Sequence, residues 1–242
     1  MYLNDTHILI YLVVAIIGGL LGQVIDYLNK TFLEEGKILS KESIKKYRMI
    51  SRPRYSLILI NALIYCILLY KFGINIEFFE YAQLCTMLIC AFMVDYKVQI
   101  IPNRLNLTMF ELGLIFVFIY GMSNLNLSKD LLLGMLAGGG IFLGITLIGG
   151  LIAGKEAMGL GDVKLMGALG LYFGVTRIVM ISVLSFLVGA IGSIAVILAR
   201  KNRKDGYIPF GPFIVIATII TILVPTNTLY VFLMKVFTLG MY

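Results

Sequence analysis

GMLAGGGIFLGITLIGGLIAG, residues 134–154, contains no charged side chain and a single hydroxyl, that of Thr146. A helix needs roughly 20 mostly apolar residues to cross the hydrocarbon core of a bilayer. The run LIGGLIA, 147–153, lacks the alternation of apolar and polar residues that marks a barrel strand. Helices are then the only elements that satisfy their own backbone inside lipid. This stretch therefore predicts a transmembrane α-helix.

The composition extends that prediction to most of the chain. Of its 242 residues, 60% are hydrophobic and 14% are charged, and the mean hydropathy is +0.97. A soluble domain would carry about 25% charged residues. We therefore predict an all-α integral membrane protein, a polytopic bundle of about eight transmembrane helices. The expected spans are residues 7–28, 55–73, 79–94, 105–121, 131–153, 165–176, 178–199 and 211–236. The sixth is short enough to be a half-span or part of a helical hairpin.

Lysine and arginine are unevenly divided between the two sides of these spans. The first connecting loop, 29–54, is rich in both, and sixteen of the twenty basic residues fall in odd-numbered loops. Cytoplasmic loops carry the excess of basic residues, so the odd loops are expected in the cytoplasm and both termini outside. Topology and attraction to anionic lipid account for the net charge of +7, so no nucleic-acid partner is implied. We expect two parts: 1–54, the first helix with its basic cytoplasmic loop, and 55–242, the membrane-embedded domain.

Two carboxylates stand out against this apolar background. Asp95 follows the third span and Asp162 follows the fifth. Both spans run from outside to inside, so both acids are expected at the cytoplasmic membrane surface, although 67 positions separate them. An acid at membrane depth is costly and usually faces protein or water for a reason. Two carboxyls a few ångströms apart share one proton, so the charged member takes a proton from water while the other donates to a scissile carbonyl oxygen. The pair therefore predicts aspartic-protease chemistry.

The residues around the two acids fit this interpretation. Gly159 and Gly161 permit a close approach that a Cβ would block. Pro102, seven residues after the first acid, prevents a helix from continuing through it. Lys97 and Lys164 each lie two residues beyond an aspartate, where they hold a carboxylate or mark the headgroup level.

Other interpretations of the acids stay open. Asp162 could cap the sixth span, and Asp95 could be an ordinary interfacial acid. The same two acids could form the proton relay of a transporter. Asp26 is expected to pair with Lys30 one turn on, and Glu111 to form a buried helix–helix hydrogen bond.

Two motifs resemble the signature regions of type IV prepilin peptidases. DYKVQIIPN, 95–103, has the family's aspartate with a proline seven residues later, and AMGLGDVKLMGALGLYFG, 157–174, has its Gly-x-Gly-Asp. YIPFGPFIVIATI, from Tyr207, and less closely RYSLILINALIY, from Arg54, also resemble family regions. The resemblance covers most of residues 54–225.

The resemblance implies a specific activity. Members of the family are aspartic proteases that remove the short basic leader of prepilins and pseudopilins on the cytoplasmic side of the inner membrane. The apolar substrate helix stays in the bilayer. By this resemblance Asp95 and Asp162 would be the catalytic pair, and 55–242 the peptidase domain. The supporting residues would be Gly159, Gly161, Lys164, Lys97, Pro102 and Asn103. Proteolysis would need no cofactor.

Two features of the family are altered here. Many bacterial members bind zinc through two CxxC pairs in the first cytoplasmic loop, but loop 29–54 has no cysteine, so no zinc is expected. Many also methylate the new N-terminus with S-adenosylmethionine, and GGLLGQVIDYL, 18–28, resembles the family's first-span motif only loosely. Use of S-adenosylmethionine therefore stays open. So does a related Gly-x-Gly-Asp protease that cuts within the substrate helix.

Overall fold

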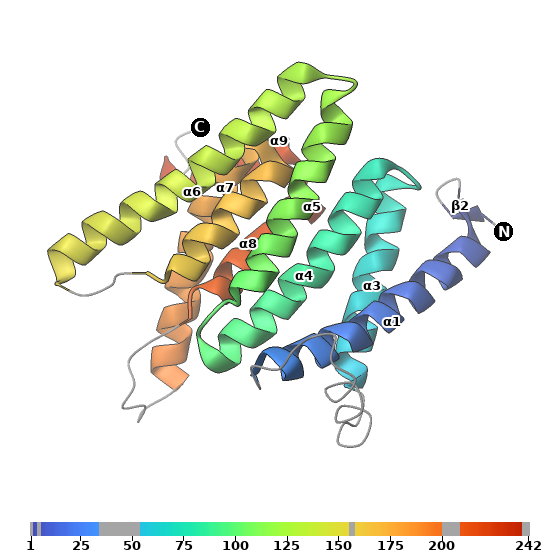
Figure 1. The fold of residues 1–242 in the computed structure, drawn as a ribbon, viewed down its shortest axis with the longest axis horizontal. Coiled ribbons are helices and arrows are strands. Elements are labelled where there is room, and N and C mark those ends of the chain that lie inside the picture. Colours follow the sequence, from blue (N-terminus) through green and yellow to red (C-terminus); the bar gives the residue numbers. More distant parts are fainter. Residues whose placement is uncertain (1, 4–5, 34–53, 155–157, 200–208, 239–242) are drawn as a thin grey trace. The chain divides into compact units, whose positions relative to one another are not determined.

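The computed structural model describes residues 2–3, 6–33, 54–154, 158–199 and 209–238. These residues are almost entirely helical (Figure 1). The strands are β1 (Tyr2–Leu3) and β2 (Thr6–His7), an antiparallel pair of two residues each that the sequence did not predict. The helices are α1 (Ile8–Leu33), α3 (Tyr55–Phe72), α4 (Ile76–Val98), α5 (Asn103–Gly121), α6 (Leu125–Ala153), α7 (Leu160–Ala199), α8 (Gly211–Leu223) and α9 (Thr226–Phe237).

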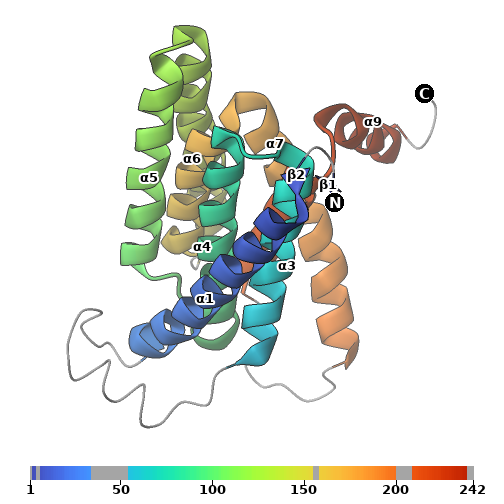
Figure 2. The ribbon, with the colours of Figure 1, turned by 90° about the vertical axis from the view of Figure 1, so that its right-hand side faces the viewer.

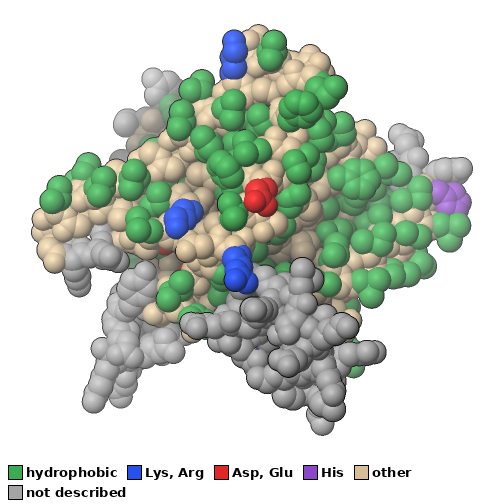
Figure 3. All heavy atoms as spheres, viewed as in Figure 1, with side chains coloured by type: hydrophobic (Ala, Val, Ile, Leu, Met, Phe, Trp, Pro, Cys, Tyr) green, Lys and Arg blue, Asp and Glu red, His purple; other side chains and the backbone are tan. Residues whose placement is uncertain are grey.

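The all-α membrane class is confirmed. Within the described ranges, six helices are long and apolar enough to cross a bilayer: α1, α3, α4, α5, α6 and α7. Many of their apolar side chains point outward, and Leu151, Ile152 and Leu198 are each more than three-quarters exposed. Apolar side chains also cover much of the face drawn in Figure 3. Such a surface is favourable only where lipid replaces water.

The chain forms two compact units, Met1–Val98 and Gln99–Tyr242. The first contains α1, α3 and α4, and the second contains α5 to α9. Helix α1 packs against both α3 and α4, so the first helix is part of a three-helix unit. The sequence predicted a different division, at residue 54, between the first helix with its basic loop and the peptidase domain. That functional division stays a prediction.

Small and polar residues join the helices of the first unit. The Asn61 side-chain amide donates a 2.7 Å hydrogen bond to the carbonyl of Gly18 on α1. The Tyr65 hydroxyl on α3 lies 2.9 Å from the Thr86 hydroxyl on α4. Helices in lipid associate through close packing and such interhelical hydrogen bonds, because lipid provides no hydrophobic force between them.

Helix α7 is a helical hairpin. Gly174 has φ 67° and ψ −180°, a conformation that favours glycine and interrupts the helix. A Cβ added at Gly138 of α6 would meet both Met166 and Ile178, which lie on opposite sides of the break. Residues twelve apart therefore lie beside one position of α6, so the two halves of α7 run antiparallel (Figure 2). Two segments were expected here, at 165–176 and 178–199. The structure has two, but the break lies at Gly174, three residues earlier than expected, and the short segment is half of a hairpin.

The single span expected at 211–236 is wrong. The chain breaks between α8 and α9, where Val224 is extended and Pro225 follows with φ −58° and ψ 138°. Proline lacks a backbone N–H and disfavours helical backbone at the residue before it. Helix α8 has 13 residues, so it is about 20 Å long, less than the hydrocarbon thickness. The sequence prediction missed the break because it ran the apolar residues of 211–224 and 229–236 together across Pro225 and the three polar residues that follow it.

Two glycines set the contact between α6 and α7. A Cβ added at Gly170 would overlap the carbonyl of Gly134, whereas one added at Gly140 would meet nothing within 4 Å. We expect Gly170→Ala to lower the free energy of unfolding by about 1–3 kcal/mol, because overpacking forces the helices apart. The matched substitution Gly140→Ala should be neutral or slightly stabilising. Thermal unfolding of the purified protein in detergent measures both, and equal melting temperatures for the two variants would contradict the contact.

Candidate active site

Asp95 lies in the last turn of α4 and is 4% exposed. On the same helix, the rings of Phe92 and Tyr96 stack 6.3 Å apart. The helix ends at Val98, and Gln99 then adopts φ 60°. This places the first acid where the sequence predicted it, at the end of a long apolar helix.

Asp162 lies in the first turn of α7 and is 6% exposed. A turn precedes it, in which the Asp162 N–H donates to the carbonyl of Gly159 at 3.1 Å. Since the helix begins at Leu160, Asp162 is inside the first turn and does not occupy the capping position before it. The dipole of a helix stabilises an anion at its N-terminus and opposes one at its C-terminus. Asp162 lies at the N-terminal end of its helix and Asp95 at the C-terminal end of its own.

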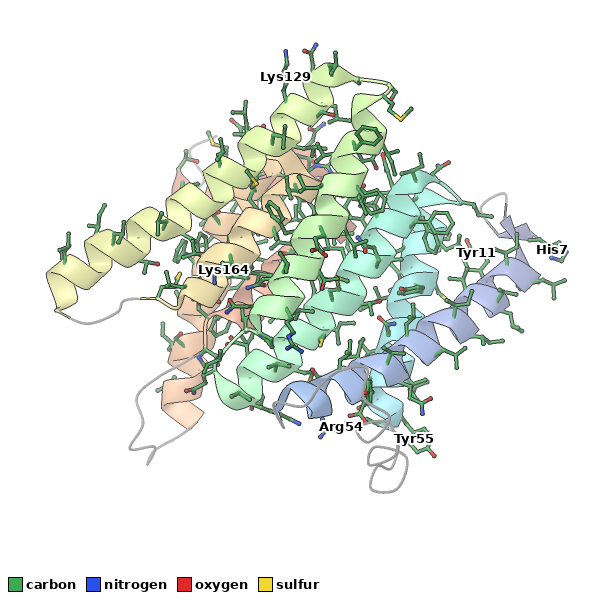
Figure 4. All side chains as sticks on the ribbon, viewed as in Figure 1. His7, Tyr11, Arg54, Tyr55, Lys129 and Lys164 are labelled. Atoms are coloured by element: carbon green, nitrogen blue, oxygen red, sulfur yellow. The ribbon has the colours of Figure 1, made fainter. Side chains whose placement is uncertain are left out.

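The start of α5 holds the GLGDVK segment, 159–164, at two points. The Asn106 amide donates to the carbonyl of Gly161 at 3.0 Å, immediately before the acid. The Lys164 ammonium donates to Oδ1 of Asn103 at 2.7 Å, two residues after the acid. Both bonds join α5 to α7 within the second unit, and Figure 4 shows Lys164 on its helix. Helix α5 therefore holds the backbone just before Asp162 and a side chain just after it.

Gly161 and Pro102 shape this contact. A Cβ added at Gly161 would lie 3.3 Å from Cβ of Ile101, so the absence of a side chain lets the two segments touch. Pro102 precedes α5 with φ −61° and ψ 131°, and the helix begins at the next residue, Asn103. Pro102 therefore prevents α4 from continuing and stands directly before α5, the helix that supports Asp162.

Asn106 was missed by the sequence reading. It lies three residues after Asn103, on the same face of α5, and it is 4% exposed. This i, i+3 pair of asparagines behind a proline was the available signal. An amide buried in a membrane helix needs a partner, which here is the backbone of the Gly-x-Gly-Asp segment.

The structure also places the other charged residues whose surroundings were predicted from the sequence. Glu111 is exposed, so the buried helix–helix hydrogen bond expected for it is wrong. Asp26 is 1% exposed and forms an ion pair with Arg54, whose Nε lies 3.4 Å from its Oδ1 (Figure 4). The side chain of Lys30, its expected partner, lies outside the described residues. Lys97 is exposed in the last turn of α4.

Each compact unit contributes one of the two acids, Asp95 from the first and Asp162 from the second. Their pairing therefore stays a prediction. Among the described residues no group of three or more His, Cys, Asp or Glu could hold a metal ion. Residues 34–53 of the first connecting loop lie outside those residues, so the expectation about zinc stays a prediction as well.

Comparison with known proteins gives a consistent result. The model of the type IV leader peptidase family matches residues 82–194, which include both acids. A protein named prepilin leader peptidase/N-methyltransferase from Aeromonas hydrophila is 35% identical over 136 residues, 56% of this chain and 46% of that protein. The protein of the same name from Pseudomonas aeruginosa (strain PAO1) is 32% identical over 171 residues, 70% of this chain and 58% of that protein. The chain thus spans about half the length of the curated relatives it matches. No solved structure matches it significantly.

The bond from Asn106 to Gly161 can be tested directly. We expect Asn106→Leu to lower the kcat of the peptide hydrolysis that the sequence predicts by about 10- to 100-fold, because small displacements of a catalytic group are costly. KM should change little, since the bond holds the enzyme's backbone and not the substrate. Thr108→Val on the same helix removes a hydroxyl bonded only to the Arg104 carbonyl and should leave kcat unchanged. A KM effect without a kcat effect in Asn106→Leu would contradict the positioning role.

Proposed function

We propose that the chain belongs to the type IV leader peptidase family, whose model matches residues 82–194, and that it is an aspartic endopeptidase that removes the basic leader of prepilins or pseudopilins. One observation carries the proposal. Asp95 and Asp162 are both buried, and each lies within one turn of the end of an apolar helix. Carboxylates are rare in such surroundings unless they serve a function.

The proposed mechanism uses the two acids as a unit. One proton is shared between them, and the charged carboxylate removes a proton from water while the other carboxyl donates to the carbonyl oxygen of the scissile bond. The resulting hydroxide adds to the carbonyl carbon. The C–N bond then breaks as the leaving nitrogen takes the proton that the first carboxylate removed from water, and a hydroxyl of the intermediate returns its proton to the second carboxylate. Both products leave with the dyad back in its starting protonation state.

The covalent chain supports a pairing of these acids. Asp95 is six residues before Ile101, and an extended chain covers at most about 3.5 Å per residue, or about 21 Å over this distance. Ile101 packs against Gly161, the residue before Asp162. In any arrangement of the two units, the chain therefore keeps the α-carbon of Asp95 within reach of the segment that carries the second acid.

The membrane setting determines which bond would be cut. The described helices are those of a multi-pass membrane protein. Both acids follow spans that the distribution of basic residues orients toward the cytoplasm. We propose that the protein resides in the inner membrane and cuts at that face, where a basic leader is in water while the apolar substrate helix remains in lipid.

The proposed function does not include methylation of the new N-terminus. The relatives' printed names include N-methyltransferase, but the chain spans only about half of their length. We assign none of the described residues to the binding of S-adenosylmethionine.

Two acid-to-amide substitutions test the proposed function. We expect Asp95→Asn and Asp162→Asn each to reduce leader removal from a co-expressed prepilin at least about 100-fold, because each removes one half of the proton-sharing pair. Glu77→Gln is the matched control, since Glu77 is an exposed acid in the first turn of the same helix as Asp95. It should cleave at the rate of the unaltered protein. Both aspartate variants should still insert into the membrane in normal amounts, and full activity in either one rejects the dyad.

The cut site separates this function from its nearest alternative. Mass spectrometry of the processed prepilin should show a product that begins immediately before the apolar helix. A product that begins within the apolar segment would instead identify a protease that cuts inside the membrane. Ion flux in proteoliposomes without any cleavage would identify a transporter.

A further inference from the structure

The second unit has a groove beside the GLGDVK segment. Its volume is about 400 Å³, and it lies where α5, α6 and α7 meet. The side chains that line it are Asn103, Asn106, Leu107, Phe110, Met135, Lys164, Gly167 and Ala168. One of these residues, Lys164, is labelled in Figure 4. The groove is therefore contiguous with the residues that hold Asp162.

Polar and apolar residues are separated along the groove. Its polar residues all come from the first turns of α5 and α7, where Asn103 and Lys164 are hydrogen-bonded to each other. The rest of the lining is apolar, with Leu107 and Phe110 on α5 and Met135 on α6. A fitting occupant is apolar along most of its length and polar at the end that reaches Lys164.

Two of the residues that line the groove are small. Gly167 and Ala168 lie on the first half of α7, one turn beyond Lys164. Small residues on one helix let a second helix approach closely in lipid. A volume of about 400 Å³ accommodates a few large side chains, so it matches one face of a helix and not a whole helix.

One buried atom distinguishes a peptide from a lipid chain as the occupant. Oδ1 of Asn106 has no hydrogen-bond partner among the described residues, although the amide nitrogen of the same side chain is bonded to Gly161. A buried acceptor without a donor is unfavourable, and an incoming N–H would recover that cost. The first turn of a helix offers free backbone N–H groups, whereas an acyl chain offers none.

We propose that this groove is the docking site for the N-terminal turns of the substrate's apolar helix. The helix lies over Gly167 and Ala168, with its side chains against Leu107 and Phe110, and its first turn lies near Asn106. The residues just before that turn then reach Lys164, two residues from Asp162, which is where a leader must be cut. The inference rests on the proposed function and adds to it the surface that recognises the substrate.

Kinetics of a matched pair of substitutions test the groove. Phe110→Ala should raise the KM for a purified prepilin in detergent by roughly tenfold, as expected for the loss of an aromatic contact at an interface, with kcat little changed. Phe118→Ala is the control, because Phe118 lies two turns further along α5, is 72% exposed and is not part of the groove lining. It should leave KM unchanged. Equal KM values for the two variants would overturn the proposal.

Photocrosslinking separates a failure of the groove from a failure of the proposed function. With p-benzoylphenylalanine at position 107 in an Asp95→Asn background, the uncut prepilin should crosslink through its apolar segment, whereas the same reagent at position 118 should give little. Crosslinking that is equal at both positions, or that captures only lipid at position 107, overturns the groove even if the unaltered enzyme cleaves. Crosslinking confined to position 107 supports the groove even if no cleavage is ever found.

Discussion

Backbone hydrogen bonding inside lipid is the constraint on which this structure depends. An unpaired N–H or C=O costs several kcal/mol where no water is available, so the chain is helical wherever it is expected to cross the bilayer. Irregular backbone is then restricted to a few places. Among the described residues they include the segment around Gln99 and Pro102, the turn before Asp162, Gly174 and Pro225, besides the short connections at Gly73 and between α5 and α6. Both candidate catalytic acids lie within one turn of such a place, where an acid can reach water.

Close helix packing allows the second unit to present Asp162. Gly134 and Gly170 bring α6 and α7 into backbone contact, and Gly174 turns α7 back on itself. The first half of that hairpin therefore begins with the acid and is held by α6 along its length. Asn106 and Asn103 on α5 then fix the backbone and side chain on either side of Asp162. The same packing leaves Gly167 and Ala168 in the lining of the groove.

Two kinds of buried polar group serve different ends in this protein. In the first unit, Asn61, Tyr65 and Thr86 bond to one another or to backbone and thereby join helices. At the candidate site, Asn106 uses only its amide nitrogen, which leaves an acceptor for an occupant of the groove. A fully satisfied network stabilises packing, whereas a buried acceptor without a donor has a cost that a ligand's N–H would recover.

The sequence by itself determined the membrane class, most of the helices and the two acids, because hydropathy and the spacing of Asp, Pro and Gly are local properties of the chain. It also separated the two halves of α7. It joined α8 to α9 through Pro225, because the mean hydropathy over 211–236 stays high although Pro225 and the polar residues after it interrupt the helix. It placed Glu111 in a buried contact, and it overlooked Asn106. The exposure of Glu111 and the contact of Asn106 were decided only by the tertiary structure. Both depend on which face of α5 is turned toward α7, and the spacing of residues along the chain does not specify that rotation.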